Sequence, residues 1–361
     1  IMAGVELIKN NSFDSIIAFG GGSPIDSAKA MSVLAKYGGK IKDYKFPRII
    51  SQKGLPIIAI PTTAGTGSEV TKFTIITDEK TDEKMLCVGS AFIPVAAIID
   101  YELTLSLPKR TTADTGIDAL THALEAYVSK KCNLFSNTQA ISAMKLIAPN
   151  LRTVFKEPKN IEAREKLMMG ATLAGMAFSN SSVALVHGMS RPIGAFYHVP
   201  HGLSNAMLLP IVTEFSLPSA PKKYSECSIA MGIASENDSI EIANKKLITE
   251  LKSLNEDLEV PTPLKYGINK NAFFNNNSPS NFLLLVASKI LVYCSNAPFV
   301  FPLRSNASAC SNNAAHSLLA SYSFMVDLSP GFNSIARSNA FNAFLHLPDL
   351  RNILPRCKFP R

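Results

Sequence analysis

The sequence lacks the features that mark membrane and secreted proteins. Its longest apolar run, from Phe282 to Cys294, is shorter than the roughly 20 residues that span a bilayer, and Lys289 interrupts it. None of the six cysteines forms a CxxC pair, and no signal peptide is recognisable. Scattered thiols of this kind favour a reducing compartment over a disulfide framework. We therefore expect a cytoplasmic protein with no membrane partner.

Acidic residues are also scarce, 28 against 36 basic ones, which gives a net charge of +8. Most of the excess lies after residue 274, where seven basic residues accompany only Asp327 and Asp349. No cluster of Lys and Arg forms the stripe with which nucleic-acid-binding proteins follow phosphates. We therefore expect no nucleic-acid partner.

The 361 residues are 47% hydrophobic and 18% charged, which excludes wholesale disorder and leaves room for about two domains. Within the first hundred residues, 15–19, 55–60 and 95–99 are typical of buried strands, and a helix is expected from the glycines at 20–22 to about residue 37. Residues 72–77 indicate an antiparallel ribbon. Strands that alternate with helices in this way predict a mostly parallel sheet.

After Pro108 the pattern becomes helical. An α/β domain over residues 1–107 followed by an all-α domain over 108–274 is the simplest interpretation, with the boundary near 105–109. The expected helices cover residues 111–130, 135–150, 161–178, 180–197 and 200–216.

The segment 275–361 differs from both halves. It is rich in Ser, Asn, Phe and Leu and has no clear helix caps. Two interpretations are open: a divergent helical end, or a tail that is translated out of frame. We place no functional residue there.

A glycine loop follows the first strand, with Gly20, Gly21 and Gly22 ahead of the helix. Glycines let a ligand approach the backbone closely. We expect Ser23 to cap the helix, Pro24 to occupy its first position, and Asp26 to complete a capping-box-like arrangement. The free N–H groups and the dipole of such a helix start attract phosphate. A plain tight turn before a capped helix is the alternative.

A second loop, residues 61–69, follows the strand that ends at Ile60 and contains Thr62, Thr63 and Thr66 together with two glycines. Open α/β sheets bind ligands beyond the carboxyl ends of their strands. A threonine-rich surface turn would explain one such loop, but two loops at one sheet edge favour a dinucleotide.

The expected helical half contains a possible metal site. Asp118 and His122 are spaced i, i+4 and project from one helix face. His187 lies in an apolar segment, where a buried imidazole needs a partner, and His201 begins another expected helix. One carboxylate and three imidazoles suit iron(II) or zinc. A surface ion pair between Asp118 and His122 remains the alternative, and His198, with its exposed-looking flanks, is a weaker competitor as a ligand.

Taken together, these motifs resemble those of the iron-dependent (type III) alcohol dehydrogenases, near 1,3-propanediol dehydrogenase and lactaldehyde reductase. The resemblance extends from residue 1 to about residue 273 and includes the segments 20–29, 61–69, 116–125 and 187–202. It implies a Rossmann-like α/β part and an all-α domain, an architecture like that of dehydroquinate synthase. It also implies NAD(P)-linked interconversion of a small primary alcohol or diol and its aldehyde by a homo-oligomer.

The resemblance also assigns residues. It implies Fe²⁺, or Zn²⁺, bound by Asp118, His122, His187 and His201, and it names no further catalytic group. It implies contacts with NAD, or NADP, from a larger set: Gly21, Gly22, Ser23, Asp26, Thr62, Thr63, Thr66 and Lys84.

The sequence departs from the family at three places. Family members begin with further strands, so we expect a truncated sheet, and Arg191 stands where some relatives have a histidine proposed to relay protons. The family's closing helices are not recognisable after residue 274. Two other functions therefore stay open: an inactive, truncated fragment of such an enzyme, or an NAD- and metal-dependent lyase of the dehydroquinate-synthase type.

Overall fold

A small parallel sheet organises the N-terminal part of the chain in the computed structural model, which describes residues 1–81 and 83–268. Its strands are β1 (Ile16–Gly20), β2 (Ile57–Pro61) and β5 (Ala96–Ala97), in the order β1-β2-β5. Both pairings are parallel, as the strand–helix alternation predicts. Parallel pairing brings the loops that follow β1 and β2 to the same edge of the sheet.

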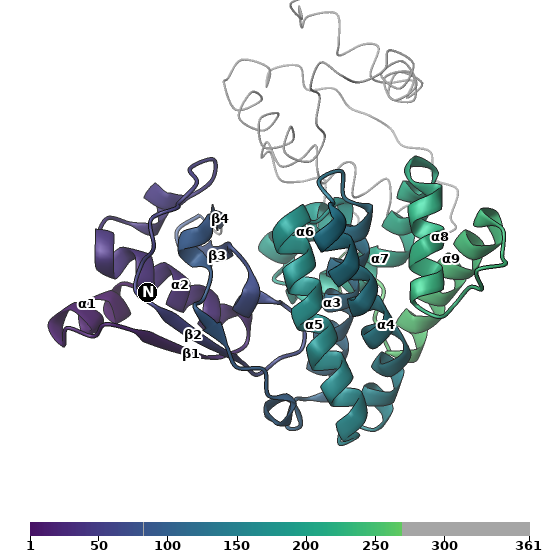
Figure 1. Cartoon of the computed structure of the whole chain (residues 1–361), viewed down its shortest axis with the longest axis horizontal. Coiled ribbons are helices and arrows are strands. Elements are labelled where there is room, and N and C mark those ends of the chain that lie inside the picture. The colour runs from purple at the N-terminus through teal and green to yellow at the C-terminus, as the bar shows by residue number, and fades with distance from the viewer. Residues whose placement is uncertain (82, 269–361) are drawn as a thin grey trace, which may run out of the picture. The chain divides into compact units, whose positions relative to one another are not determined.

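Two helices lie on the same side of β1 and β2 (Figure 1), α1 (Met2–Asn10) and α2 (Gly22–Tyr37). Ile25 and Ala28 of α2 are buried against apolar side chains of β1 and β2. This contact fixes the start of α2 directly beyond the carboxyl end of β1.

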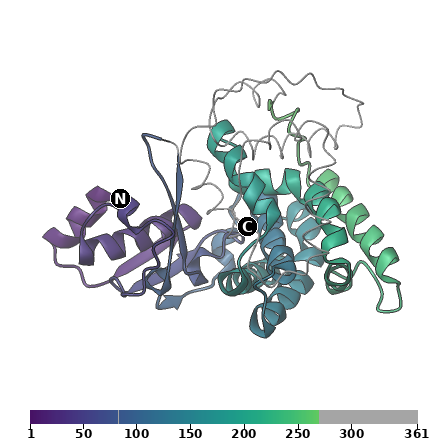
Figure 2. The same ribbon diagram turned by 90° about the horizontal axis from the view of Figure 1, so that it is seen from above.

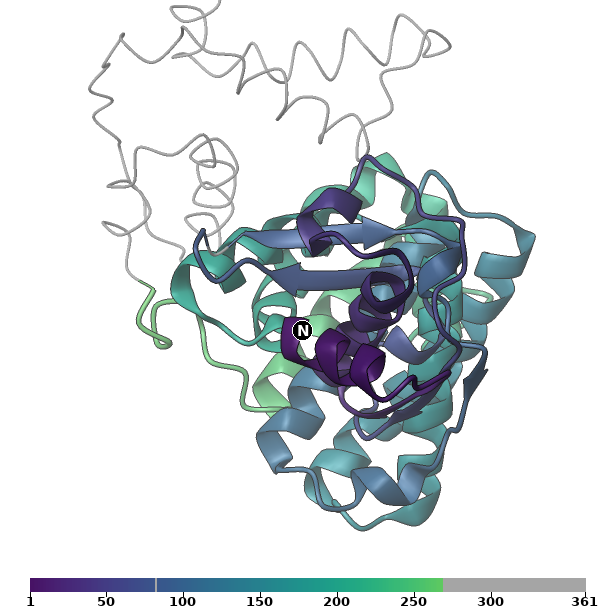
Figure 3. The same cartoon turned by 90° about the vertical axis from the view of Figure 1, so that its left-hand side faces the viewer.

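The predicted ribbon is an antiparallel hairpin of β3 (Phe73–Thr77) and β4 (Lys84–Val88), seen in Figure 3. The sequence pattern indicates its first strand only. Its inner side chain Thr74 is fully buried, and its hydroxyl donates to the carbonyl oxygen of Asp26, 2.8 Å away. The hairpin therefore packs on α2 and not on the sheet.

Helices alone form the remainder of the described chain (Figure 2). They are α3 (Lys109–Val128), α4 (Leu134–Lys156), α5 (Ile161–Ser181), α6 (Leu185–Tyr197), α7 (His201–Ser216), α8 (Pro221–Ala230) and α9 (Ile240–Asp257). The central helix α3 packs against α4, α5 and α7, and Ile117 and Leu120 on it are fully buried. The predicted fold class, an α/β part followed by helices, is confirmed.

A sharp break separates α5 from α6. Ser182 has a positive φ of 78°, and the two helices are bent by 103°. Among the described residues no single helix is long and apolar enough to cross a bilayer, and only this bent pair passes such a test, by length and composition alone. Because of this break, α6 runs in a different direction from α5, and His187 in its first turn contacts Glu125 of α3.

The start of α2 differs from the expected capping. The helix begins at Gly22 with Gly21 as its N-cap, and no side chain caps it. The capping box assigned to Ser23 and Asp26 is wrong, because the Asp26 carboxylate accepts hydrogen bonds from the Ser68 hydroxyl and the Ile75 amide. The carboxylate that would have capped the helix is thus hydrogen-bonded to residues far away in the sequence.

All described residues belong to one compact unit. The division at residues 107 and 108 therefore stays a prediction. The segment 275–361, for which an unusual tail was expected, lies outside the described residues.

Candidate metal and cofactor site

Four side chains expected to bind a metal come together in the helical part. Asp118 and His122 project from neighbouring turns of α3, His187 lies in the first turn of α6, and His201 is the first residue of α7. The Nε2 atoms of His122, His187 and His201 lie 3.9, 3.5 and 3.7 Å from Oδ1 of Asp118. One donor atom from each residue lies within 4.8 Å of the others.

These separations suit a shared ion. Bonds from zinc to histidine nitrogen are about 2.0–2.1 Å, so two donors on one ion are at most about 4.2 Å apart. The three distances to Asp118 are below that value. Asp118, His122 and His187 are buried, and His201 is partly exposed. One carboxylate and three imidazoles form a donor set for Fe²⁺ or Zn²⁺.

The electrostatics of the cluster also suit a cation. Burial by itself would raise the pKa of Asp118, but the imidazoles of His122 and His201 outweigh it and hold that pKa well below its usual range. Burial lowers the pKa of His122 to about 4 and that of His201 to about 3, against the opposing charge of Asp118. At neutral pH the cluster thus offers an anionic carboxylate and two neutral imidazoles. The third imidazole differs: burial by itself would lower the pKa of His187, but the carboxylates of Glu125 and Asp118 raise it to about 9, so an ion bound there displaces a proton from this ring.

Two further polar side chains contact this cluster, and the sequence analysis assigned no role to either. Glu125, two turns after Asp118 on α3, accepts a hydrogen bond at 2.6 Å from Nδ1 of His187. Asn205 of α7 donates from Nδ2 to Oδ1 of Asp118 at 2.6 Å, and the same atom lies 3.1 Å from Nε2 of His187. The i, i+7 and i, i+4 spacings to Asp118 and His201 were the only sequence signals for them.

The two loops expected to bind a cofactor meet at the edge of the sheet. The Thr62 amide donates to the carbonyl oxygen of Gly20 at 3.0 Å. A Cβ built on Gly21 would lie 3.2 Å from Cγ2 of Thr63, and one on Gly22 would lie 2.7 Å from Cγ2 of Thr66. The absence of side chains at both glycines is therefore what allows the threonines to come so close.

The second loop continues to the helices that carry the metal cluster. Gly65 packs on Thr115 of α3, one turn before Asp118, where an added Cβ would lie 2.6 Å from Cβ of Thr115. Gly67 has a φ of 61°, and its added Cβ would lie 2.5 Å from Cα of Gly175 in α5. The backbone contact at these glycines brings the expected cofactor loop next to the expected metal ligands.

The remaining predicted residues lie around this junction. Ser23 is exposed in the first turn of α2. Lys84 begins β4 and reaches α6, where its Nζ lies 2.9 Å from the position of a Cβ on Gly194. Burial lowers the pKa of Lys84, and the positive charge of Arg191 on α6 adds to this effect. His198 is exposed at the C-terminal end of α6 and outside the cluster, as its flanks predicted.

Comparison with known families decides the broader assignment. The family model described as "Iron-containing alcohol dehydrogenase" matches residues 1–101. The model for the C-terminal part of the Fe-containing alcohol dehydrogenase family matches residues 112–276. The chain belongs to the iron-containing alcohol dehydrogenase family. It is thus an oxidoreductase by family, and the resemblance inferred from its motifs is confirmed.

Individual members of the family are similar over most of the chain. Alcohol dehydrogenase 4 of Saccharomyces cerevisiae is 38% identical over 267 residues, which cover 73% of this chain and 68% of that protein. The 1,3-propanediol dehydrogenase of Citrobacter freundii is also 38% identical, over 262 residues, with the same coverage of each chain.

Solved structures of the family share the fold. A crystal structure of 1,3-propanediol oxidoreductase has a TM-score of 0.74 and 32% identity, and the match covers 80% of each chain. The sulfoacetaldehyde reductase of Bifidobacterium kashiwanohense, in complex with NAD⁺, has a TM-score of 0.70 and 30% identity, with 80% of this chain and 79% of that chain covered.

Proposed function

We propose that the chain interconverts a small primary alcohol or diol and its aldehyde, with Fe²⁺ as the metal and NAD as the hydride carrier. Zn²⁺ could replace Fe²⁺, and NADP could replace NAD, in the same reaction. The observation that carries the proposal is the convergence of Asp118, His122, His187 and His201 beside a loop that also meets the glycine turn of α2. Relatives named as propanediol dehydrogenase and lactaldehyde reductase support this substrate class.

The four side chains would hold the ion. When bound, a divalent cation supplies Lewis acidity, which lowers the pKa of an alcohol hydroxyl. Asp118 contributes the negative charge, and the depressed pKa values of His122 and His201 keep their nitrogen lone pairs available at neutral pH. Because His201 is partly exposed, we propose that substrate reaches the cluster beside this residue.

The two loops would hold the dinucleotide. The first turn of α2, with Gly21, Gly22 and Ser23, presents backbone N–H groups to a phosphate. Thr62 and Thr63 follow β2, and the hydroxyl of Thr63 is buried and finds no hydrogen-bond partner among the described residues. Such a hydroxyl is available to a ligand. The carboxylate of Asp26 is already engaged by protein donors, so its contribution is to position the loop.

We further propose that the chain acts in the cytoplasm as a homo-oligomer, with small alcohols and aldehydes, and not nucleic acids or membranes, as partners. Gel filtration coupled to light scattering measures the oligomeric state. A monomer at micromolar concentration would contradict that part of the proposal.

The function is tested with chain purified without metal and then loaded with Fe²⁺ or Zn²⁺. We expect absorbance at 340 nm to rise when NAD⁺ or NADP⁺ is supplied with propanol or 1,3-propanediol. The variant Asp118→Asn keeps the side-chain shape but loses the charge, and should lose most bound metal and nearly all turnover. Asp114→Asn, one turn earlier on α3 and paired with Arg110, is the matched control and should keep both.

The same experiment separates the alternatives. Turnover restricted to a phosphorylated sugar acid would favour a lyase of the dehydroquinate-synthase type. The absence of a cooperative thermal transition, of bound metal and of turnover would favour an inactive fragment. A folded, metal-loaded chain that leaves every tested alcohol and aldehyde unchanged would contradict the proposed activity.

A further inference from the structure

Glu125 is buried next to the metal cluster but is not one of its expected ligands. Its side chain comes from the same helix as Asp118 and His122 and is almost inaccessible to solvent. A buried carboxylate needs hydrogen-bond donors, because its desolvation is costly. Glu125 has two: Oε2 accepts from Nδ1 of His187 at 2.6 Å, and Oε1 accepts from the backbone N–H of Val186 at 2.5 Å.

The contact with His187 determines which ring nitrogen is free. A carboxylate can only accept, so Nδ1 must carry the proton in this hydrogen bond. The other nitrogen, Nε2, then faces Oδ1 of Asp118 at 3.5 Å, inside the cluster. Since a neutral imidazole ligates a metal through its unprotonated nitrogen, this arrangement presents the correct atom of His187 to the ion.

The second contact fixes the backbone that carries the ring. Val186 lies in the first turn of α6, where backbone N–H groups have no partner within the helix. By binding this N–H, Glu125 ties the start of α6 to α3 immediately before His187. Both the position and the orientation of the imidazole therefore depend on one carboxylate.

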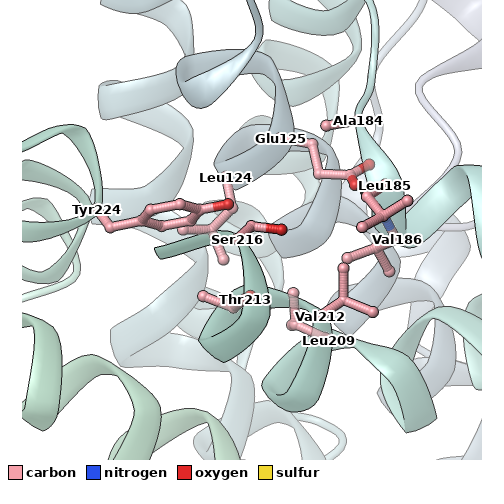
Figure 4. A pocket seen from close by; sticks show the side chains of 10 residues that line it. All are labelled: Leu124, Glu125, Ala184, Leu185, Val186, Leu209, Val212, Thr213, Ser216 and Tyr224. Carbon is pink, nitrogen blue, oxygen red and sulfur yellow. Dashed lines mark hydrogen bonds between the residues drawn. The ribbon is translucent and has the colours of Figure 1, made fainter. Parts of the chain in front are cut away.

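A small cavity lies on the other side of Glu125. Its volume is about 20 Å³, which is enough for one water molecule. Its lining comes from α3, α6, α7 and α8 and includes apolar side chains together with the hydroxyl-bearing Thr213, Ser216 and Tyr224 (Figure 4). The lining contains no second carboxylate and no lysine. The guanidinium of Arg191 on α6 lies close enough to interact electrostatically with Glu125.

We propose that Glu125 is the positioning residue of the metal site, which holds His187 with Nε2 toward the ion. The proposal rests on the metal site of the proposed function, but it concerns a residue that binds neither metal nor substrate. Outer partners of this kind commonly contribute a factor of about 10–100 in metal affinity. Carboxylates are well suited to the role because they fix the ring tautomer and raise the basicity of the ligating nitrogen.

Two variants test this. Glu125→Gln keeps the shape, but only one of its two polar atoms can accept. Either the amide NH₂ faces the Val186 N–H, or it faces Nδ1 of His187 and forces the ring proton onto Nε2. Glu125→Ala removes both hydrogen bonds and joins its space to the neighbouring cavity. Glu226→Gln is the matched control, because Glu226 of α8 accepts from the Tyr127 hydroxyl and does not touch the cluster.

The first readout is affinity for Zn²⁺ and Co²⁺, measured by competition with a chromophoric chelator. We expect affinity to fall about 10-fold in Glu125→Gln and about 100-fold in Glu125→Ala, with Glu226→Gln within about 2-fold of the parent chain. Chemical unfolding of each metal-free variant shows whether it is folded, so that a fall in affinity is counted only for folded protein.

The second readout is the NMR signal of the histidine rings in the Zn²⁺-loaded chain. A short hydrogen bond to a carboxylate should move one Nδ1–H proton far downfield, and this signal should disappear in Glu125→Ala. If the parent chain binds no metal, the proposed function fails. If it binds metal and both Glu125 variants bind equally well, or if the downfield signal persists in Glu125→Ala, the role of Glu125 is overturned.

Discussion

The two loops at the sheet edge can meet because Gly21 and Gly22 have no side chain. Gly22 begins α2 and faces Thr66, and a Cβ added to this glycine would lie 2.7 Å from Cγ2 of Thr66, closer than side chains tolerate. Gly21 is less crowded, with 3.2 Å to Thr63. The space in which a dinucleotide phosphate would lie thus depends on the lack of a side chain at these two glycines.

Gly22→Ala should therefore displace Thr66 and weaken cofactor binding. Inserting one methyl group into a tightly packed contact typically costs about 1–3 kcal/mol, so we expect the KM for NAD to rise at least about 5-fold. Steady-state kinetics with varied NAD measures it. Gly38→Ala, at the C-cap of α2, is a control for loss of stability alone: its φ of 73° makes alanine strained, but its added Cβ meets nothing within 4 Å, so the KM for NAD should not change. An unchanged KM in Gly22→Ala would contradict the prediction.

The sequence indicated the four expected ligands but not the residues that hold them. Asp, His and glycine patterns have recognisable spacing, since i, i+4 pairs share a helix face. Glu125 and Asn205 have their roles through contacts between helices far apart in sequence, which no local spacing reveals. The assignment of Asp118, His122, His187 and His201 as ligands stays a prediction until metal binding is measured.

Among the elements, α2 and the β3–β4 hairpin are joined by a buried lysine. Lys29 of α2 is fully buried, and its ammonium donates to the carbonyl oxygens of Thr71 and Phe73 at 3.0 and 2.8 Å. It also contacts the hydroxyl of Thr71. This clamp keeps the loop 61–69, which leads into β3, next to the N-terminal turn of α2.

The clamp has a predictable pH dependence. Burial lowers the pKa of Lys29 to about 8, although the charges of Asp26 and Glu69 oppose the shift. Between pH 8 and 10.5 the folded chain loses this proton while the unfolded chain keeps it. The unfolded state then binds more protons, so this group makes the free energy of unfolding rise with pH across that window.

Lys29→Met removes the group and serves as the reference. We expect the parent chain to gain up to about 3 kcal/mol relative to Lys29→Met between pH 8 and 10.5, because one pKa unit corresponds to about 1.36 kcal/mol. Urea unfolding of both proteins at several pH values measures the difference. Groups that do not interact with Lys29 cancel, whereas Asp26 and Glu69, whose pKa values its charge lowers, contribute to the difference. A difference that is constant, or that shrinks as pH rises, would contradict the prediction.

Most elements could be predicted, and the exceptions have physical reasons. The strands β1 and β2 and the helices α2, α3, α5 and α7 are expected within a few residues, because their apolar patterns are regular. Helices α4 and α6 are also expected, but the end of α4 and the start of α6 are misplaced by about six and five residues. The short α1, and α8 and α9, are not identified from the pattern. Strand β4 is missed because Lys84 to Val88 shows no clean alternation, and its partner β3 supplies the pairing.

At the scale of the whole molecule, one surface of the sheet is conspicuously apolar. Ile17 and Phe19 alternate along β1, the edge strand of the described sheet, and are 68% and 59% exposed. Exposed apolar side chains on an edge strand are a known route to association.

Ile17→Thr should raise solubility without weakening the fold. Thr has a high strand propensity and removes apolar surface, so the change in the free energy of unfolding should stay within about 0.5 kcal/mol. Static light scattering against protein concentration measures association, and urea unfolding measures stability. Ala18→Thr, on the buried face of the same strand, is the contrast and should destabilise the chain. Unchanged light scattering in Ile17→Thr would show that this surface does not drive association.

Family and fold class followed from the sequence because several motifs in a fixed order are specific, and the comparisons confirm both. The substrate did not follow, since no charged side chain in the motifs selects among small alcohols. The choice between NAD and NADP depends on a contact to the adenosine ribose, for which the sequence offers no candidate.

Because Gly67 and Gly175 are in backbone contact, each restricts which residues the other position can accept. Gly67 is already favoured by its own backbone, because its φ of 61° lies in the left-handed region. Gly175 is not, since a helix interior such as that of α5 accepts alanine readily. Each is also constrained by the backbone opposite, so a side chain at either position would push the loop 61–69 and α5 apart. Substitution at either position is therefore restricted by a residue more than a hundred positions away in the sequence.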